Sequence, residues 1–430
     1  LLCKSRFNLR IFGADLSGLT FMRITVFEYE KLLIKQHRNE QLHYITAMDA
    51  AQLQNIFVGD VPAFVRRDNY VAAQQWVGVV DLQGLSIEVL PKISFCESSL
   101  QNRKILINML CTVDHITLSS PRESSVSIES FGFRDLMIYN YIVLLEQYVK
   151  SSLILDYVKI TKTQSVLRGK IDFRQQFNRP EEFPTKFKCT YSKYLKDNKI
   201  NQLLLCALTQ MFNDTGSSQL RYRIKKLTHE FSDIQNVSRD IALKTHIAFN
   251  SINSKIQSPV CFARLYLENL SVGFSAGKQK AQFMLFDMSK LYERYVYCCY
   301  HKIYGSHVNY QYAKKYLVKS SSGRRYILLR PDIVLKRDDC LTILDTKWKR
   351  IHGFAKESDI YQMNAYGTSF DGCRAVYLLY PYDSDSTAYI GDYSLELANN
   401  TRQNLRIRLV DLSISLNWPR FRSHLISLVE

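Results

Sequence analysis

The C-terminal third of the chain holds three charged residues, Asp332, Asp345 and Lys347, in a strand–turn–strand pattern. A polar stretch at residues 336–339 separates two apolar segments and is typical of a turn. If the turn is centred between its last two residues, Asp332 and Asp345 lie directly opposite each other, with Cβ atoms about 4.5–5.5 Å apart. Lys347 lies two residues beyond Asp345 and projects from the same face. The spacing therefore predicts that two carboxylates and an ammonium group converge at one end of a hairpin.

Two carboxylates at so short a distance repel each other, and a hard divalent cation between them offsets this repulsion. Mg2+ takes oxygen ligands and keeps several waters for substrate phosphates; Mn2+ is the alternative metal. A lysine at such a site can stabilise the charge on a phosphate, or help to orient and deprotonate the attacking water. The other interpretation is an exposed set of salt bridges on a sheet face, because surface ion pairs are common and weak.

Apolar periodicity indicates the elements that carry these residues. The N-terminal stretch alternates as strands do, and Gly84 marks a turn between residues 76–81 and 85–90. From about residue 100 to 270 the spacing is helical, interrupted by a turn and short strand at 168–173 and a loop at 213–218. The rest alternates between helix and strand, with helices expected at 288–304, at 357–368 and at the C-terminus, and strands at 326–336, 341–348, 375–380 and 405–410.

This alternation favours an α+β multidomain protein whose C-terminal α/β domain contains a mixed sheet. We expect three parts: a β-rich N-terminal domain at 1–98, a mainly helical middle region at 99–280, and the C-terminal domain at 281–430.

The composition favours a polyanionic partner. Lys and Arg number 57 against 40 Asp and Glu, a formal charge of +17, and DNA is the commonest polyanion. A basic protein with no nucleic-acid role is the alternative. Ten cysteines without a C-x-x-C pair are typical of reduced thiols. The chain has no apolar run long enough for a membrane span and no secretion signal at its start, which lacks Met, so we expect a cytoplasmic protein without membrane contact.

Short motifs connect the charged triad to a known group of enzymes. Pro331-Asp332 followed by Asp345-Thr346-Lys347 is the PD-(D/E)XK nuclease signature. Gln362 and Tyr366 form a Q-x-x-x-Y element after it, and further matching segments lie at 77–79, 87–93, 167–172, 197–201, 286–293 and 380–381. Together these motifs, over roughly residues 24–381, resemble the McrC family, the nuclease subunit that partners the GTP-driven McrB motor.

The resemblance implies a Mg2+-dependent endonuclease with a PD-(D/E)XK domain that cuts double-stranded DNA. It implies that Asp332 and Asp345 are metal ligands, that Thr346 also belongs to the metal site, and that Lys347 is the catalytic lysine. Glu293 and Gln362 would be supporting catalytic groups. For Glu293 a solvated charge on a helix face is an equal alternative, and Tyr366 is interpreted as structural.

The family resemblance also implies a McrB-like AAA+ GTPase ring as partner, whose GTP hydrolysis this chain would stimulate. The N-terminal half, including the hairpin around Gly84 and the helices after residue 100, is expected to contact that ring. Residues 273–279 look like a phosphate loop but are one residue short, with Gln279 where Ser or Thr would bind Mg2+, so this chain is expected to bind no nucleotide.

Two other functions stay open from the sequence. The chain could be a non-catalytic assembly subunit that binds DNA and activates a GTPase, or a repair nuclease of the same fold. Trp348, Lys349 and Arg350, beside the triad, suit either contact with a DNA backbone or the capping of a strand end.

Overall fold

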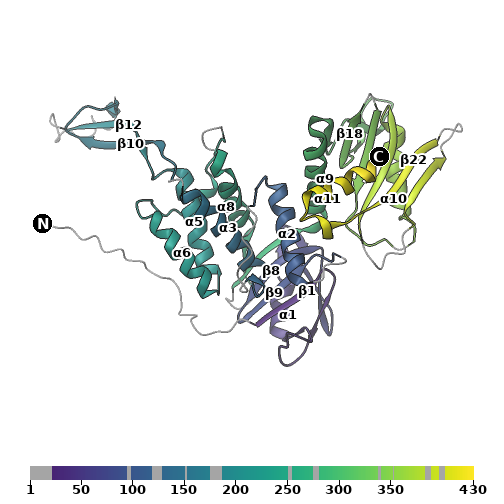
Figure 1. The fold of residues 1–430 in the computed structure, drawn as a ribbon, viewed down its shortest axis with the longest axis horizontal. Coiled ribbons are helices and arrows are strands. Elements are labelled where there is room, and N and C mark those ends of the chain that lie inside the picture. The colour runs from purple at the N-terminus through teal and green to yellow at the C-terminus, as the bar shows by residue number, and fades with distance from the viewer. Residues whose placement is uncertain are drawn as a thin grey trace.

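The computed structural model describes residues 22–93, 98–118, 128–150, 153–174, 186–249, 254–274, 280–337, 340–351, 353–382, 389–396 and 402–430. It is a mixed α and β structure with several sheets (Figure 1). All eight cysteines in these residues are free thiols, as the sequence predicts. None of the helices in these ranges is long and apolar enough to cross a membrane.

The N-terminal part is built on a five-stranded sheet in the order β1-β9-β8-β14-β13. The predicted hairpin is confirmed: β8 (Trp76–Leu82) and β9 (Leu85–Leu90) pair antiparallel, and Gly84 has the positive φ of +71° that the turn needs. Smaller elements complete this part: β1 Met22–Phe27, β2 Lys31–Ile34, β3 Tyr44–Ile45, α1 Ala47–Gln54, β4 Phe57–Val58, β5 Val61–Pro62, β6 Phe64–Arg66 and β7 Tyr70–Ala73.

Two strands of this sheet come from much later in the chain. The hairpin of β13 (Leu270–Phe274) and β14 (Lys280–Asp287) inserts β14 beside β8. A Cβ on Gly78 would lie 2.0 Å from the Met284 carbonyl oxygen, so only glycine permits this close approach. The boundary expected at residue 280 therefore falls inside a hairpin of the N-terminal sheet. Most of the expected phosphate-loop-like connector, residues 275–279, lies outside the described residues.

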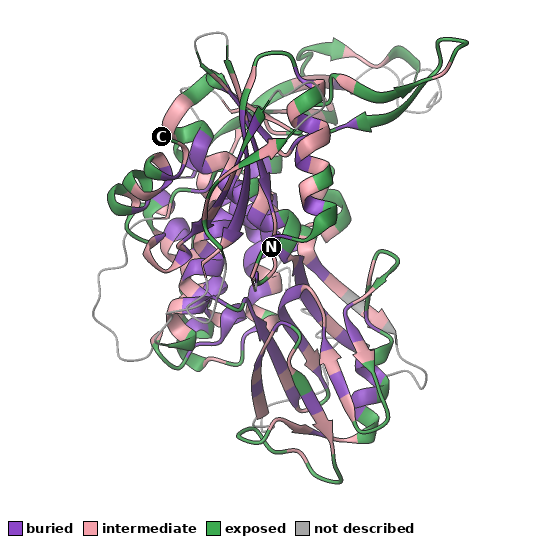
Figure 2. Ribbon diagram, turned by 90° about the vertical axis from the view of Figure 1, so that its right-hand side faces the viewer, coloured by how far each residue is buried: buried purple, intermediate pink, exposed green. Residues whose placement is uncertain are grey.

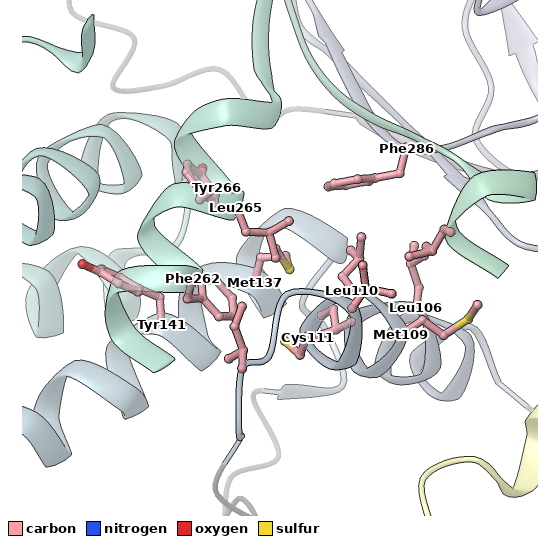
Figure 3. Packing of buried hydrophobic residues seen from close by; sticks show 14 of the residues in the cluster. Leu106, Met109, Leu110, Cys111, Met137, Tyr141, Phe262, Leu265, Tyr266 and Phe286 are labelled. Atoms are coloured by element: carbon pink, nitrogen blue, oxygen red, sulfur yellow. The ribbon is translucent and has the colours of Figure 1, made fainter. Parts of the chain in front are cut away.

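The middle region is a helical layer whose apolar faces share one core. Side chains of α2, α3 and α8 meet there, with Phe286 of β14 at the edge (Figure 3). The helices are α2 Ser99–Val113, α3 Phe133–Val149, α5 Lys199–Asp214, α6 Ser218–Glu230, α7 Arg239–Leu243 and α8 Gln257–Asn269. The break between α5 and α6 confirms the predicted loop.

A three-stranded sheet interrupts these helices, so the mainly helical middle region also holds two strands that the sequence pattern does not predict. The short strand predicted near 170 is present as β11 (Lys170–Ile171), but it pairs with β12 (Phe187–Leu195), which pairs with β10 (Asp156–Gln164). Figure 1 shows this sheet at the end of the molecule away from the C-terminal sheet. Most residues of β10 and β12 are partly or fully exposed, so the apolar pattern that marks a half-buried strand is weak.

The C-terminal part is a six-stranded mixed sheet between two helical layers. Its strands alternate side chains between two cores, because α9 and α11 cover one face and α10 covers the other. Buried residues run along the strands in the middle of this sheet (Figure 2). The order is β15-β18-β19-β20-β22-β21. The strands are β15 Val308–Tyr310, β18 Ile333–Arg337, β19 Cys340–Thr346, β20 Cys373–Pro381, β21 Gly391–Glu396 and β22 Arg402–Val410; the helices are α9 Met288–Tyr304, α10 Glu357–Ser369 and α11 Trp418–Val429.

One strand prediction in this part is wrong. The stretch expected as a single strand at 326–336 forms two strands in different sheets: β17 (Arg325–Leu329) pairs with β16 (Lys315–Lys319), while β18 pairs with β15 and β19. Pro331, at the break, has no N–H for a ladder. The main-chain carbonyls of Pro331 and Asp332 instead accept hydrogen bonds from the N–H groups of residues 312 and 311.

Candidate active site

The hairpin of β18 and β19 has the register that the sequence predicts. Ile333 pairs with Leu344 at one end and Arg337 with Cys340 at the other. The tip of the turn, residues 338–339, lies outside the described residues. Asp332 directly precedes β18, and its Oδ2 accepts hydrogen bonds from the Thr346 main-chain N–H at 2.8 Å and the Thr346 hydroxyl at 2.9 Å. The first carboxylate is therefore held against the end of the strand that carries the second.

Asp345 is a buried carboxylate with unmet bonding capacity. Its side chain is 0% exposed, and Oδ1 has no hydrogen-bond partner within the described part of the chain. Its Oδ2 forms an ion pair with Lys347 Nζ at 2.5 Å. A buried carboxylate oxygen without a partner is costly, because it has lost its water and gained nothing in return. A carboxylate oxygen in this environment has the chemistry of a cation ligand.

The electrostatics of the site also favour a cation. The pKa of Asp332 is raised to about 7, first by burial and then by the neighbouring carboxylates of Asp345 and Glu293, against the lowering effect of the Thr346 hydrogen bonds. Burial also raises the pKa of Asp345, against the lowering effect of Lys347. These carboxylates outweigh the effect of burial on Lys347 and raise the pKa of its ammonium group. The single positive charge of Lys347 therefore does not neutralise all of the carboxylates around it.

Lys347 is held by residues of α10. Its Nζ donates to Gln362 Oε1 at 2.9 Å, and Gln362 Nε2 lies 2.9 Å from the Tyr366 hydroxyl. The Tyr366 hydroxyl donates to the Arg330 carbonyl at 3.1 Å. Gln362 and Tyr366 are four residues apart, so they lie on the same helix face. The structure therefore places Gln362 in contact with Lys347, and the Tyr366 hydroxyl fixes the position of Gln362.

Glu293 lies near the carboxylate pair but outside its contacts. It is on α9, and its Oε1 accepts a hydrogen bond from Gln311 Nε2 at 3.0 Å. Among the described residues, no three His, Cys, Asp or Glu side chains are arranged to hold a metal ion together. The site thus offers the two carboxylates of Asp332 and Asp345, with water or phosphate oxygens to complete the shell, an arrangement that suits Mg2+. Since the N–H and hydroxyl of Thr346 hold Asp332, its main-chain carbonyl is the group left to bind metal.

The residues after Lys347 bind other parts of the protein. Lys349 Nζ lies 2.5 Å from Asp359 Oδ2, which also accepts from the Tyr380 hydroxyl at 3.0 Å. Trp348 Nε1 donates to both carboxylate oxygens of Glu28 at 3.0 Å. These contacts favour the anchoring of a strand end over contact with DNA for both side chains. Sequence reasoning missed Glu28, because it is 320 residues from its partner and no local pattern marks it.

The Glu28 carboxyl predicts a pH dependence of stability. Burial raises its pKa to about 8, although hydrogen bonds from Trp348 and the Lys92 N–H oppose the shift. The folded chain thus binds this proton more tightly than the unfolded chain, so stability is full below about pH 4.5 and falls as the pH rises towards 8. Because of Glu28, the free energy of unfolding should fall by at most about 1.4 kcal/mol per pH unit in this window. We expect Glu28→Gln to remove this pH dependence.

Denaturant unfolding at a series of pH values, without divalent metal, measures this difference. Glu40→Gln, at an exposed position of the same part of the chain, is the control. If Glu28→Gln and the unaltered chain show parallel pH profiles, the carboxyl is already ionised in the folded protein and the assignment is wrong.

The amino-acid sequence also shows to which protein family the chain belongs. The sequence matches the family described as McrBC 5-methylcytosine restriction system component over residues 71–381. This match spans well over half of the chain, and the protein belongs to that family. No curated protein sequence matches it.

Two chains of solved structures are similar to this one. A chain in the Thermococcus gammatolerans assembly of McrB AAA+ hexamers with bound McrC is 15% identical, with a TM-score of 0.64, over 95% of this chain and 100% of that one. A chain in the Thermococcus gammatolerans McrBC complex is 16% identical, with a TM-score of 0.45, over 64% of this chain and 86% of that one. At this identity the first of these shows a shared fold across nearly the whole chain.

Proposed function

We propose that this chain is the DNA-cutting subunit of a McrBC-type restriction system with a PD-(D/E)XK active site. It hydrolyses phosphodiester bonds of double-stranded DNA with Mg2+, in the cytoplasm, as an antiphage defence. The observation that carries the proposal is the buried, unpartnered oxygen of Asp345 beside Asp332 and Lys347. Family membership supports it independently.

The residues of the site have separate roles in this proposal. Asp332 and Asp345 hold the metal, which when bound neutralises phosphate charge and lowers the pKa of a bound water. Lys347 has a raised pKa and keeps its proton at neutral pH. It therefore donates to the negative charge that develops on the phosphate, and does not take a proton from water. Gln362 fixes the position of the ammonium group through its 2.9 Å contact.

We also propose a GTP-hydrolysing AAA+ ring as the partner. The support is the related structure, in which McrC is bound to McrB AAA+ hexamers. The hairpin around Gly84 is a poor candidate for the contact, because β8 and β9 are almost wholly buried in the sheet. The helical middle region, with the exposed sheet of β10 and β12, remains the proposed contact, and the chain would stimulate GTP hydrolysis through it.

The test is DNA cleavage by the full chain with and without its AAA+ partner. We expect the isolated chain to hydrolyse no nucleotide and to cut poorly, and the assembled complex to cut methylated duplex DNA when GTP and Mg2+ are present. Chelation of the metal and omission of GTP are the controls. Absence of cutting on both methylated and unmethylated duplexes by an assembled, GTP-hydrolysing complex would contradict the nuclease role and favour an assembly factor.

A further inference from the structure

The hairpin of β16 and β17 stands outside the six-stranded sheet and exposes an unusual number of apolar side chains. Six large hydrophobic residues on its two strands are between 36% and 62% exposed: Tyr316, Leu317, Val318, Tyr326, Ile327 and Leu328. Exposed apolar side chains gathered on one element often mark an interaction site. A two-stranded hairpin is also barely stable alone, so a partner that covers it would strengthen it.

The charge of the hairpin indicates what that partner is. Between Gln311 and Pro331 the sequence contains six basic residues and no acidic one: Lys314, Lys315, Lys319, Arg324, Arg325 and Arg330. Lys315 is paired with Asp371 at 2.7 Å, while the other five are exposed. Such a surface attracts a polyanion, because each phosphate contact releases counterions. A protein partner would gain no comparable benefit from a uniformly positive ribbon.

Aromatic rings hold two of these cations in place. The Arg324 guanidinium lies over the Tyr326 ring, with 5.5 Å from its carbon to the ring centroid, and Arg325 lies over Tyr316 at 5.7 Å. Stacking on a ring restricts the motion of an arginine and leaves its N–H groups at the edge available to phosphate oxygens. The cationic groups are therefore positioned before any ligand arrives.

The base of the hairpin is joined directly to the candidate active site. Only Arg330 and Pro331 separate β17 from Asp332, a distance of at most about 10 Å of extended chain. The Arg330 carbonyl accepts from the Tyr366 hydroxyl, which also contacts Gln362. A ligand bound along the hairpin would therefore lie beside the carboxylates.

Backbone strain sets one residue of the hairpin apart. Ile327 has a φ of +55°, which is an outlier for a β-branched residue, and it is 62% exposed. Its cross-strand pairing with Leu317 is missing from the ladder, which is otherwise regular. Strain of this kind is unfavourable and is concentrated at functional positions.

We propose that the β16–β17 hairpin is a DNA-binding arm that holds the duplex against the active site. Lys319, Arg324 and Arg325 bind phosphates, and the Leu317–Ile327 face enters the minor groove, where apolar side chains can widen base steps. This inference rests on the proposed function, because it identifies how the substrate of the same site is bound.

The test uses the full chain carrying Lys319→Ala and Arg325→Ala together, at two exposed residues paired in the ladder. Binding to a short mixed-sequence duplex is measured by fluorescence anisotropy over a range of salt concentrations, without divalent metal. Loss of two phosphate contacts should make the plot of log affinity against log salt concentration less steep, by about two units of slope. Cleavage by the assembled complex should fall in parallel. Arg66→Ala with Arg67→Ala, at exposed positions at the end of β6 in the N-terminal part, removes the same charge elsewhere and should leave both unchanged.

A second variant separates the groove contact from the phosphate contacts. Ile327→Gly should raise the melting temperature, because glycine accepts the positive φ, yet weaken binding with an unchanged salt slope. If the double alanine variant binds like the Arg66 and Arg67 control, or loses only its association with the motor, the arm is not a DNA contact and the proposal is overturned. If the unaltered chain binds DNA through the hairpin but its complex never cuts, the nuclease role fails and the arm stands.

Discussion

Asp345→Asn is expected to abolish DNA cleavage while leaving the chain as stable as before, or more stable. The substitution keeps the shape of a fully buried side chain but removes a charge whose Oδ1 has no hydrogen-bond partner in the described part of the chain. The substitution does not leave Lys347 as a buried charge without a partner, because Lys347 retains its contact with Gln362 and its side chain is 21% exposed. We expect a loss of about 100- to 1,000-fold or more in the cleavage rate, comparable to removing one group that stabilises developing charge.

The same experiment separates a metal ligand from a structural ion pair. Asp359 offers a matched control, since it is also a buried aspartate, paired with Lys349 at 2.5 Å, but it is satisfied by the Tyr380 hydroxyl. Asp359→Asn should lose stability, because breaking a buried ion pair typically costs about 3–5 kcal/mol. Denaturant unfolding without metal and cleavage with Mg2+ are measured on both variants. Equal destabilisation of the two, or undiminished cutting by Asp345→Asn, would contradict the metal assignment.

Lys347→Met is expected to lower the maximal cleavage rate by about 100- to 1,000-fold while metal affinity is retained. The ammonium group lies between Asp345 and Gln362 and keeps its proton, so its loss removes a donor to the phosphate and not a metal ligand. The rate is measured as a function of Mg2+ concentration, which reports affinity and maximal rate separately.

Lys349→Met is the matched control for Lys347. It removes the same charge two residues away, from a side chain that binds Asp359 instead of the carboxylate pair. We expect it to keep most of the cleavage rate. If high Mg2+ restores the rate of Lys347→Met and only the concentration at half-maximal rate changes, the lysine acts on the metal and the proposed role is wrong.

The core of the candidate site could be predicted from the sequence because its determinants are local. The register of β18 and β19 follows from a turn position and a two-residue period, and α9 follows from its helical spacing and from Asp287, whose side chain accepts from two N–H groups of the first turn. Strands buried on both faces produce long apolar runs that are easy to recognise, as in β20.

The errors occur where the determinants are not local. The exposed strands β10, β12 and β16 lack a strong apolar period, so nothing in their own residues distinguishes them from helix or loop. The contact between Glu28 and Trp348 depends on how two distant parts of the chain pack, as does the return of β13 and β14 to the N-terminal sheet. These features belong to tertiary packing, which single-sequence periodicity does not report.

The placement of β14 beside β8 has a consequence for synthesis of the protein on the ribosome. The edge of β8 that accepts β14 emerges about 200 residues before its partner, a delay of roughly 10–40 s at ordinary elongation rates. During that time an apolar strand edge is unpaired and open to intermolecular pairing. The nascent chain therefore has to protect this edge until residue 287 has been made, and a fragment that stops before Lys280 would expose it permanently.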